Sequence, residues 1–105
     1  MIRGGIYRVN FGEVKGGHEQ RGKRFGLVIS MTDMPWSVVT VIPTSTSAQP
    51  ANFRPEIELD GERTLLLVDQ IRTVDTMYIS GEPIRHLSYS EMERVEAALS
   101  HYLGL

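Results

Sequence analysis

The chain has 105 residues, a length typical of one domain, and we expect residues 1–105 to form a single domain. It contains no cysteine, which excludes disulfides, thiolate nucleophiles and cysteine-ligated zinc, and its three scattered histidines lack metal-ligand spacing. No apolar run approaches the roughly 18 residues of a membrane span, and the first residues lack a signal-peptide core. We therefore expect a soluble, cytoplasmic protein that uses no metal or other cofactor.

The charge is distributed unevenly along the chain. The net charge of −2 argues against a general polyanion binder. Residues 1–24, however, hold six Lys or Arg against two Glu, a net +4, and the remainder holds five against eleven, a net −6. This asymmetry favours one narrow basic patch, suited to a phosphate, on an otherwise acidic body.

The first half of the chain predicts β-structure. Residues 6–11 alternate, with Tyr7, Val9 and Phe11 on one face and Arg8 and Asn10 on the other. Two further strands rich in β-branched residues are predicted, joined as a hairpin by a short link with Asp33 and Pro35. These two strands cover residues 25–31 and 38–44. Residues 45–52 have loop composition.

The second half predicts three more strands and one helix. Residues 56–60 alternate strictly, residues 65–68 read as a central strand covered on both faces, and residues 83–86 as an edge strand because of Pro83. A capping box of Ser88 and Glu91 then precedes apolar residues at helical spacing up to Gly104. Uneven strands, one terminal helix and no βαβ rhythm predict a compact, mostly β barrel.

One stretch has the composition of a binding site. Residues 16–24 hold three glycines, three cations, one imidazole, one carboxylate and one amide, with no aliphatic side chain. Glycines allow the backbone to approach a ligand closely, and the cations suit a phosphate. From composition alone this loop either binds or cleaves a phosphate compound.

In its motifs the chain resembles the PemK/MazF family of toxin endoribonucleases from bacterial toxin–antitoxin pairs. The order and spacing of four segments carry the resemblance: residues 3–11, 19–24, 43–45 and 69–75. The resemblance implies a mostly β (α+β) fold, a small SH3-like barrel of the CcdB/Kid/MazF type with a C-terminal amphipathic helix. It also implies a homodimer, metal-independent and sequence-specific cleavage of single-stranded RNA, and inhibition by a cognate antitoxin with an acidic C-terminal tail.

Three positions differ from the usual pattern of that family. Gly5 stands where an acidic residue is usual, and Phe25 where a proline follows the loop arginine. Leu67 stands where some members carry a catalytic arginine.

The chemistry of RNA cleavage assigns roles to the motif residues. The 2′-OH of RNA is the nucleophile, so the protein must supply a base, an acid and donors for the phosphoryl oxygens. Arg24 occupies the family's catalytic arginine position, and its guanidinium matches a phosphate bidentately. Thr44 occupies the position of a catalytic threonine, or else caps the loop at a strand end. Glu19 is a candidate base, or holds Arg24 in place.

The remaining candidates have open alternatives. Histidine is the side chain whose unperturbed pKa lies near neutrality, which makes His18 a candidate for acid–base work. Asp69 is a catalytic candidate by resemblance, or forms an internal ion pair that fixes its loop. The expected substrate-binding residues are Gln20, Arg21, Lys23, Arg72 and Trp36, the last as a base-stacking side chain.

Two rival functions use the same barrel. A gyrase-poisoning toxin acts by binding through an apolar, tryptophan-bearing C-terminus, whereas this chain ends His101-Tyr102-Leu103-Gly104-Leu105. A catalytically lapsed family member would serve only as an interaction module. Cleavage of RNA in EDTA distinguishes both from the nuclease.

Overall fold

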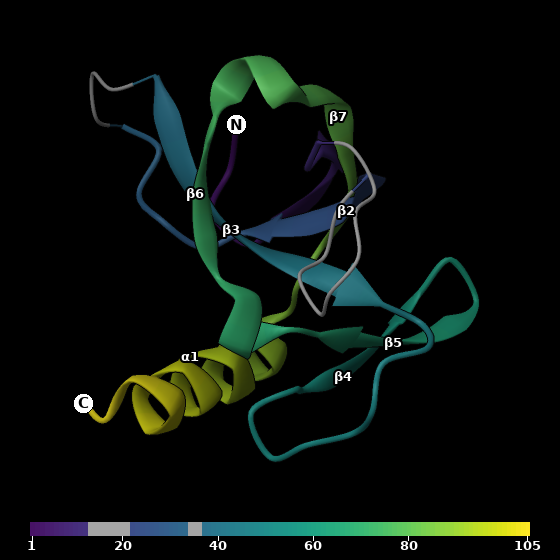
Figure 1. Ribbon diagram of the computed structural model, residues 1–105, viewed down its shortest axis with the longest axis vertical. Helices are drawn as coiled ribbons and strands as arrows, with labels where there is room; N and C mark the ends of the chain where they lie inside the picture. Colours follow the sequence, from purple (N-terminus) through teal and green to yellow (C-terminus); the bar gives the residue numbers. More distant parts are fainter. Residues whose placement is uncertain (13–21, 34–36) are drawn as a thin grey trace.

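The computed structural model describes residues 1–12, 22–33 and 37–105. Within these ranges the chain is mostly β, with one α-helix at its end (Figure 1). The strands are β1 (Gly5–Asn10), β2 (Lys23–Val28), β3 (Val38–Ser45), β4 (Glu56–Leu59), β5 (Glu62–Leu66), β6 (Arg72–Asp75) and β7 (Ile79–His86). Two 3-10 turns, η1 (Val68–Gln70) and η2 (Thr76–Tyr78), precede β6 and β7, and the helix α1 spans Tyr89–Leu103.

The strands form one strongly curved antiparallel sheet in the order β4-β5-β3-β2-β1-β7. Besides its pairing with β2, the long strand β3 pairs with two further strands, with β6 along its first half and with β5 at its end. Figure 1 shows how the sheet curls around itself as a half-barrel, with α1 lying across one end. The expected small barrel with a C-terminal helix is therefore confirmed.

Strand alternation divides the apolar side chains between two cores. One core joins the sheet to α1 and comprises Ile6, Leu27, Ile29, Ile42, Ile57, Leu59, Leu66, Val68, Val95 and Ala98. The other lies within the curl of the sheet and comprises Tyr7, Val9, Phe11, Val28, Val39 and Val41. The predicted face of β1 with Tyr7, Val9 and Phe11 is thus buried, while Arg8 and Asn10 are exposed on the opposite face.

The helix begins and ends where its sequence signals predict. The Ser88 hydroxyl accepts a hydrogen bond from the Glu91 N–H, and the Glu91 carboxylate accepts one from the Ser88 N–H, which completes the capping box. Gly104 ends the helix in the left-handed conformation at φ +72°. In the described part of the chain no helix has the length and apolar character needed to cross a membrane.

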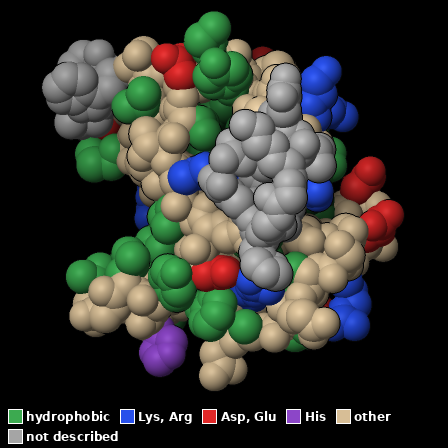
Figure 2. Space-filling model, viewed as in Figure 1, with side chains coloured by type: hydrophobic (Ala, Val, Ile, Leu, Met, Phe, Trp, Pro, Cys, Tyr) green, Lys and Arg blue, Asp and Glu red, His purple; other side chains and the backbone are tan. Residues whose placement is uncertain are grey.

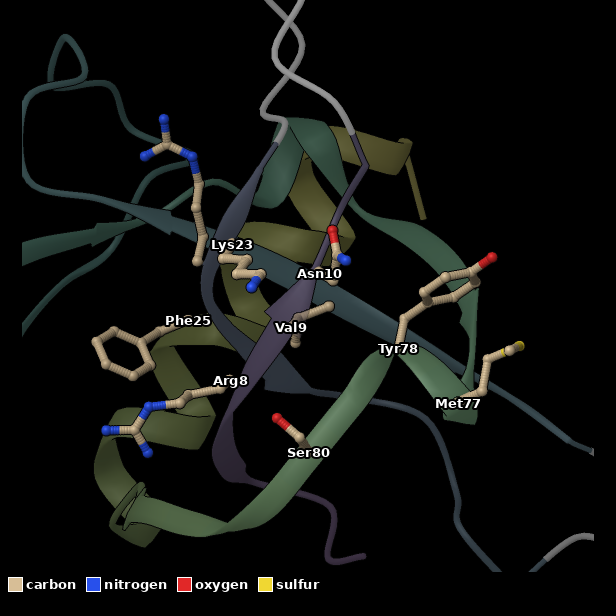
Figure 3. A pocket seen from close by; sticks show the side chains of 9 residues that line it. Arg8, Val9, Asn10, Lys23, Phe25, Met77, Tyr78 and Ser80 are labelled. Carbon is tan, nitrogen blue, oxygen red and sulfur yellow. The ribbon is translucent and has the colours of Figure 1, made fainter.

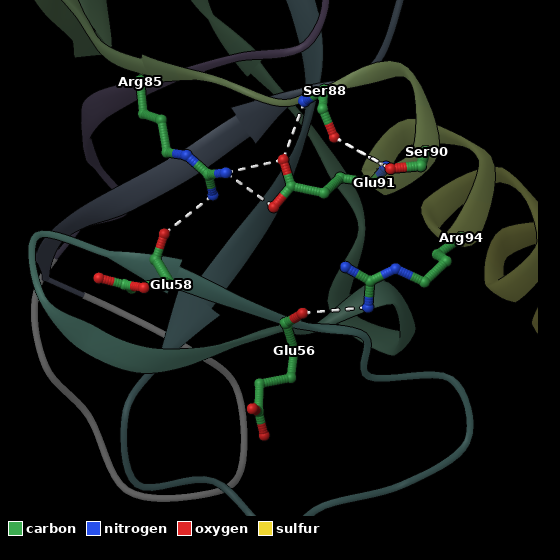
Figure 4. Close-up of polar contacts among 7 residues, drawn as sticks. All are labelled: Glu56, Glu58, Arg85, Ser88, Ser90, Glu91 and Arg94. Atoms are coloured by element: carbon green, nitrogen blue, oxygen red, sulfur yellow. Dashed lines mark hydrogen bonds and ion pairs between the residues drawn. The ribbon is translucent and has the colours of Figure 1, made fainter.

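Arginine side chains connect the edge strand β4 to β7 and to α1 (Figure 4). From β7, Arg85 donates to the carbonyl of Glu58 on β4 at 2.8 Å and to both carboxylate oxygens of Glu91 on α1 at 2.7 Å. From α1, Arg94 donates to the carbonyl of Glu56 on β4 at 3.1 Å. These donors satisfy the outward-facing carbonyls of an edge strand.

The largest difference from the sequence-based expectation lies between residues 62 and 75. The strand predicted at 65–68 begins earlier, at Glu62, and ends at Leu66, and Val68 already begins η1. Leu66, Leu67 and Val68 are buried as expected, but the Leu67 N–H donates to the carbonyl of Pro43 outside a ladder and the chain then turns. Strand β6 was not predicted, because Arg72–Asp75 is short and mostly polar.

Candidate functional site

A pocket of about 580 Å³ lies over β1, β2 and the beginning of β7 (Figure 3). Its lining combines three cations with aromatic, apolar and small polar side chains. The lining residues are Arg8, Val9, Asn10, Lys23, Arg24, Phe25, Met77, Tyr78 and Ser80. This composition suits a ligand that has both anionic and planar apolar parts, as a nucleotide does.

Register explains how the sequence builds the pocket floor. Arg8 lies opposite Phe25 on β2 and opposite Ser80 on β7, and Asn10 lies opposite Lys23. Directly paired residues share a face, so these five side chains form two adjacent rows on the outer face of the sheet. Polar residues at alternate positions of three neighbouring strands thus become one surface.

The pocket walls carry the aromatic groups. The Arg8 guanidinium carbon lies 5.5 Å from the centroid of the Phe25 ring, within the range of a cation–π contact. On the side of β7, Met77 and Tyr78 extend from η2, with 75% and 48% of their surface exposed (Figure 3). Large exposed apolar groups beside cations are unusual on a free surface and indicate a binding function.

The structure places two of the predicted site residues in this pocket. Lys23 and Arg24 begin β2 and are exposed. Arg24 is paired with Val9 on β1, so its backbone is fixed by a ladder although its side chain reaches solvent. Both positions therefore fit an electrostatic role toward a phosphate.

Thr44 is not among the residues that line the pocket. It is 5% exposed, and its hydroxyl donates to the carbonyl of Phe25 at 2.9 Å, which ties β3 to β2 next to Arg24. It does not cap the following loop. Ser45 has that role, since its hydroxyl accepts from the N–H groups of Ser47 and Ala48. The Thr44 oxygen keeps its capacity to accept a further hydrogen bond.

Asp69 is held by an arginine that the sequence motifs did not indicate. Arg54 donates from Nε to one carboxylate oxygen of Asp69 at 3.0 Å and from Nη2 to the other at 2.8 Å. Each side chain is only 17% exposed. These hydrogen bonds lower the pKa of Asp69, and the same pair raises the pKa of Arg54. The alternative of an internal ion pair, left open by the sequence, is thus present.

Arg72 is the remaining candidate that the structure describes. It begins β6, and its guanidinium carbon lies 4.4 Å above the centroid of the Phe11 ring at the end of β1. This contact belongs to the curled side of the sheet and not to the pocket lining. Its role in substrate binding stays a prediction.

Five predicted site residues lie outside the described residues. They are His18, Glu19, Gln20, Arg21 and Trp36. Their roles stay as the sequence predicts them.

Sequence reasoning missed the pocket residues Arg8, Asn10, Tyr78 and Ser80, and also Arg54. Arg8 and Asn10 were recognised only as the exposed face of a strand. The sequence nevertheless held a signal, because Arg8 is a cation on a strand face close in sequence to the glycine-rich basic loop. A cation in that setting is more informative than an isolated one.

The amino-acid sequence matches the family model described as PemK-like, MazF-like toxin of type II toxin-antitoxin system over residues 2–103. The chain belongs to this family of PemK/MazF toxins. It is also 59% identical over 105 residues to a candidate toxin of Mycobacterium tuberculosis, covering 100% of this chain and 99% of that protein.

Solved structures of PemK/MazF toxins have the same fold. An endoribonuclease from a mycobacterial species, in complex with its cognate antitoxin, aligns with a TM-score of 0.80 at 18% identity and covers 100% of this chain and 96% of the other. MazF from Deinococcus radiodurans aligns with a TM-score of 0.78 at 24% identity, over 97% and 94% of the two chains.

The positions at which this chain differs from the usual PemK/MazF pattern have local structural reasons. At Gly5, an added Cβ would lie 2.9 Å from the Tyr7 ring and 3.1 Å from the Ile2 carbonyl oxygen. Leu67 is completely buried, so this position does not present a side chain to a substrate. Phe25 continues β2 and supports Arg8.

Proposed function

We propose that this toxin is a metal-independent, sequence-specific endoribonuclease of single-stranded RNA, with mRNA, tRNA or rRNA as its target. Attack of the 2′-OH on the adjacent phosphorus would give a 2′,3′-cyclic phosphate and a 5′-OH. The observation that carries the proposal is the pocket whose lining includes Arg8, Lys23 and Arg24 together with the aromatic residues Phe25 and Tyr78. Family membership and the endoribonuclease whose fold matches support the same activity.

The described residues divide the binding work between them. Lys23 and Arg8 attract the phosphate backbone, and Tyr78 offers a ring on which a base can stack. Asn10 can read a base edge through its amide. Arg24 stabilises the charge that develops on the phosphoryl oxygens and can supply the proton to the 5′-oxygen. Thr44 supports this arrangement through its hydrogen bond to the Phe25 carbonyl.

The general base is proposed to come from the glycine-rich loop, where His18 and Glu19 are the candidates. In the described ranges no three His, Cys, Asp or Glu side chains gather as a metal site would require. We further propose that the toxin forms a homodimer in the cytoplasm. A cognate antitoxin would inhibit it by laying an acidic tail over the cationic pocket. Sedimentation at several protein concentrations measures whether the toxin forms a homodimer.

Incubation of the purified protein with a long single-stranded transcript in EDTA tests the activity. We expect cuts at a short sequence, with cyclic phosphate and 5′-OH ends. Arg24→Ala should reduce the rate by about 10² to 10³, the usual effect of removing one transition-state donor. The free energy of unfolding should change by less than about 0.5 kcal/mol, since Arg24 is exposed.

Arg63→Ala is the matched control, because Arg63 is an exposed arginine on β5 far from the pocket lining. It should cleave like the wild type. Absence of cleavage by a folded wild-type protein would refute the nuclease and favour a binding toxin or a lapsed enzyme. Equal cleavage by wild type and Arg24→Ala would refute only the role of Arg24.

A further inference from the structure

Arg54 and Asp69 form a bidentate ion pair that is largely shielded from water. The two guanidinium N–H groups that face Asp69 engage both carboxylate oxygens, and Nη1 donates to the carbonyl of Gln49 at 2.9 Å. Both side chains are largely shielded from water. A bidentate pair of this kind fixes the plane of the carboxylate as well as its charge.

The pair also fastens the segment 46–55, which follows Thr44 and Ser45. Near its end, the Arg54 N–H donates to the carbonyl of Ala51 at 3.0 Å, and the carbonyl of Pro55 accepts from Leu66 at 2.8 Å. Leu66 is in turn the register partner of Thr44. The segment therefore begins where β3 ends, just after Thr44 and Ser45. Its last residue, Pro55, returns to β5, the strand whose Leu66 lies opposite Thr44.

Asp69 closes this arrangement from the other side. It lies in η1, directly after Leu67, whose N–H donates to the carbonyl of Pro43 next to Thr44. Thr44 is thus held on one side by its hydrogen bond to the carbonyl of Phe25 on β2. On its other side lie β5, the start of η1 and the segment 46–55, which Arg54 fixes in place. A small displacement of the segment 46–55 or of η1 is therefore transmitted directly to Thr44, which is hydrogen-bonded to the neighbour of Arg24.

We infer that Arg54 is a positioning residue for RNA cleavage, which acts through Asp69 to hold the segment 46–55 and Thr44 in place, and that Asp69 is not the proton acceptor. The inference rests on the proposed nuclease function. The exclusion of Asp69 as proton acceptor is supported by its hydrogen bonds, since both of its oxygens already accept strong ones. The lowered pKa of Asp69 also makes its carboxylate a weak base.

A double-mutant cycle on cleavage tests the inference. Arg54→Met keeps the length of the side chain without its charge, and Asp69→Asn keeps its shape. If the two residues act only through each other, both substitutions should lower kcat by a common factor of about 10 to 100, the effect of slight misplacement. The double variant should lose no more than either single variant. Circular dichroism verifies that each variant is folded at the assay temperature.

The pH dependence of kcat separates positioning from proton transfer. Without Arg54, a catalytic Asp69 would still titrate, with its pKa raised toward the usual range, so Arg54→Met would show an acid limb that Asp69→Asn lacks. If Asp69 acts only through Arg54, the profiles of these two variants should coincide. An acid limb confined to Arg54→Met would overturn the inference.

Further outcomes keep the two proposals distinguishable. Arg63→Met removes an ion-paired but exposed arginine on β5 and should leave kcat unchanged. A loss in Asp69→Asn of 10² or more beyond that in Arg54→Met, as expected for a general base, would overturn the positioning role alone. Unchanged kcat in Arg54→Met would do the same. No cleavage by the folded wild type would refute the nuclease, and this inference with it.

Discussion

Gly5 shows how a single position without a side chain shapes the start of β1. The Tyr7 hydroxyl accepts a hydrogen bond from the Ile2 N–H at 2.8 Å, which holds the aromatic ring against the Gly5 backbone. Pro83 of β7 lies on the third side, 3.3 Å from the place of a Cβ. Ile2 and the Tyr7 ring can approach each other across Gly5 only because Gly5 has no side chain.

Gly5→Ala should therefore destabilise the fold by about 1 to 3 kcal/mol, the usual cost of overpacking. Urea unfolding measures the difference. In a Tyr7→Phe background the ring is freed from Ile2 and can move aside, so the same glycine substitution should cost less. Equal costs in both backgrounds would show that the Tyr7 ring is not the obstacle.

At this scale the sequence could predict residues that lie in a motif, but not those that meet across the fold. Lys23 and Arg24 stand in a basic, glycine-rich run and both line the pocket. Arg54 stands in a stretch of ordinary loop composition, and its partner Asp69 is 15 residues away. Only the return of the chain from β4 to η1 brings the two together, and no local pattern encodes that return.

Among the elements, β4 and β7 most clearly depend on side chains to complete the sheet. They are the two ends of the strand order, and the Arg85 guanidinium spans them. Arg85 also neutralises Glu91, whose side chain is 14% exposed. Burial opposes ionisation of Glu91, but the hydrogen bonds from Ser88 and Arg85 outweigh it, and the pKa of Glu91 is lowered.

Arg85→Met should lower the free energy of unfolding at pH 7 by about 1.5 to 3 kcal/mol, the range for hydrogen bonds to a charged group. A lowered carboxyl pKa stabilises the folded state above the unfolded value of about 4.3, and this contribution disappears as the pH falls through the folded pKa. The difference between wild type and variant should therefore narrow in acid. Urea titrations at several pH values measure it.

The matched control for this prediction is Arg63→Met, which breaks a surface pair with Glu56 and should lower the free energy of unfolding clearly less than Arg85→Met. Light scattering provides a second observable, since an uncovered edge strand promotes association between chains. A variant that is as stable as the wild type at pH 7 would show that Arg85 does not hold the two edges.

Strands and helix ends were predictable wherever a local pattern encodes them. The alternation in β1 and β4 and the capping box of α1 are such patterns, and each element lies where it was expected. The limits of β5 were not predictable from its apolar run, because Leu67 and Val68 are buried by tertiary contacts after the strand has ended. β6 exists because β3 is long enough to offer it a second ladder.

For the molecule as a whole, charge is concentrated where the pocket lies. Three of the cations of residues 1–24 line it, although the chain carries a net charge of −2. An anionic ligand is thus attracted to the pocket, whereas residues 25–105 together carry a net charge of −6. Such focusing should make RNA binding specific in place and strongly dependent on salt.

The salt dependence of KM measures how many phosphates the pocket neutralises. For single-stranded nucleic acid each phosphate contact contributes about 0.7 to the slope of log affinity against log salt concentration. Arg8→Ala should reduce the slope by about that amount and raise KM, with kcat little changed. Arg63→Ala should leave the slope as it is. An unchanged slope in Arg8→Ala would remove Arg8 from the RNA-binding surface.

The position of β1 in the sheet also has a consequence for how the protein is made. β1 leaves the ribosome well before β7, at residues 79–86, which is one of its two neighbours in the sheet. Ser80 and the residues of η2 complete the pocket from that side. A nascent chain therefore lacks the finished pocket until most of its own messenger has been translated. If the pocket cleaves RNA as proposed, this activity arises only after β7 has been synthesised.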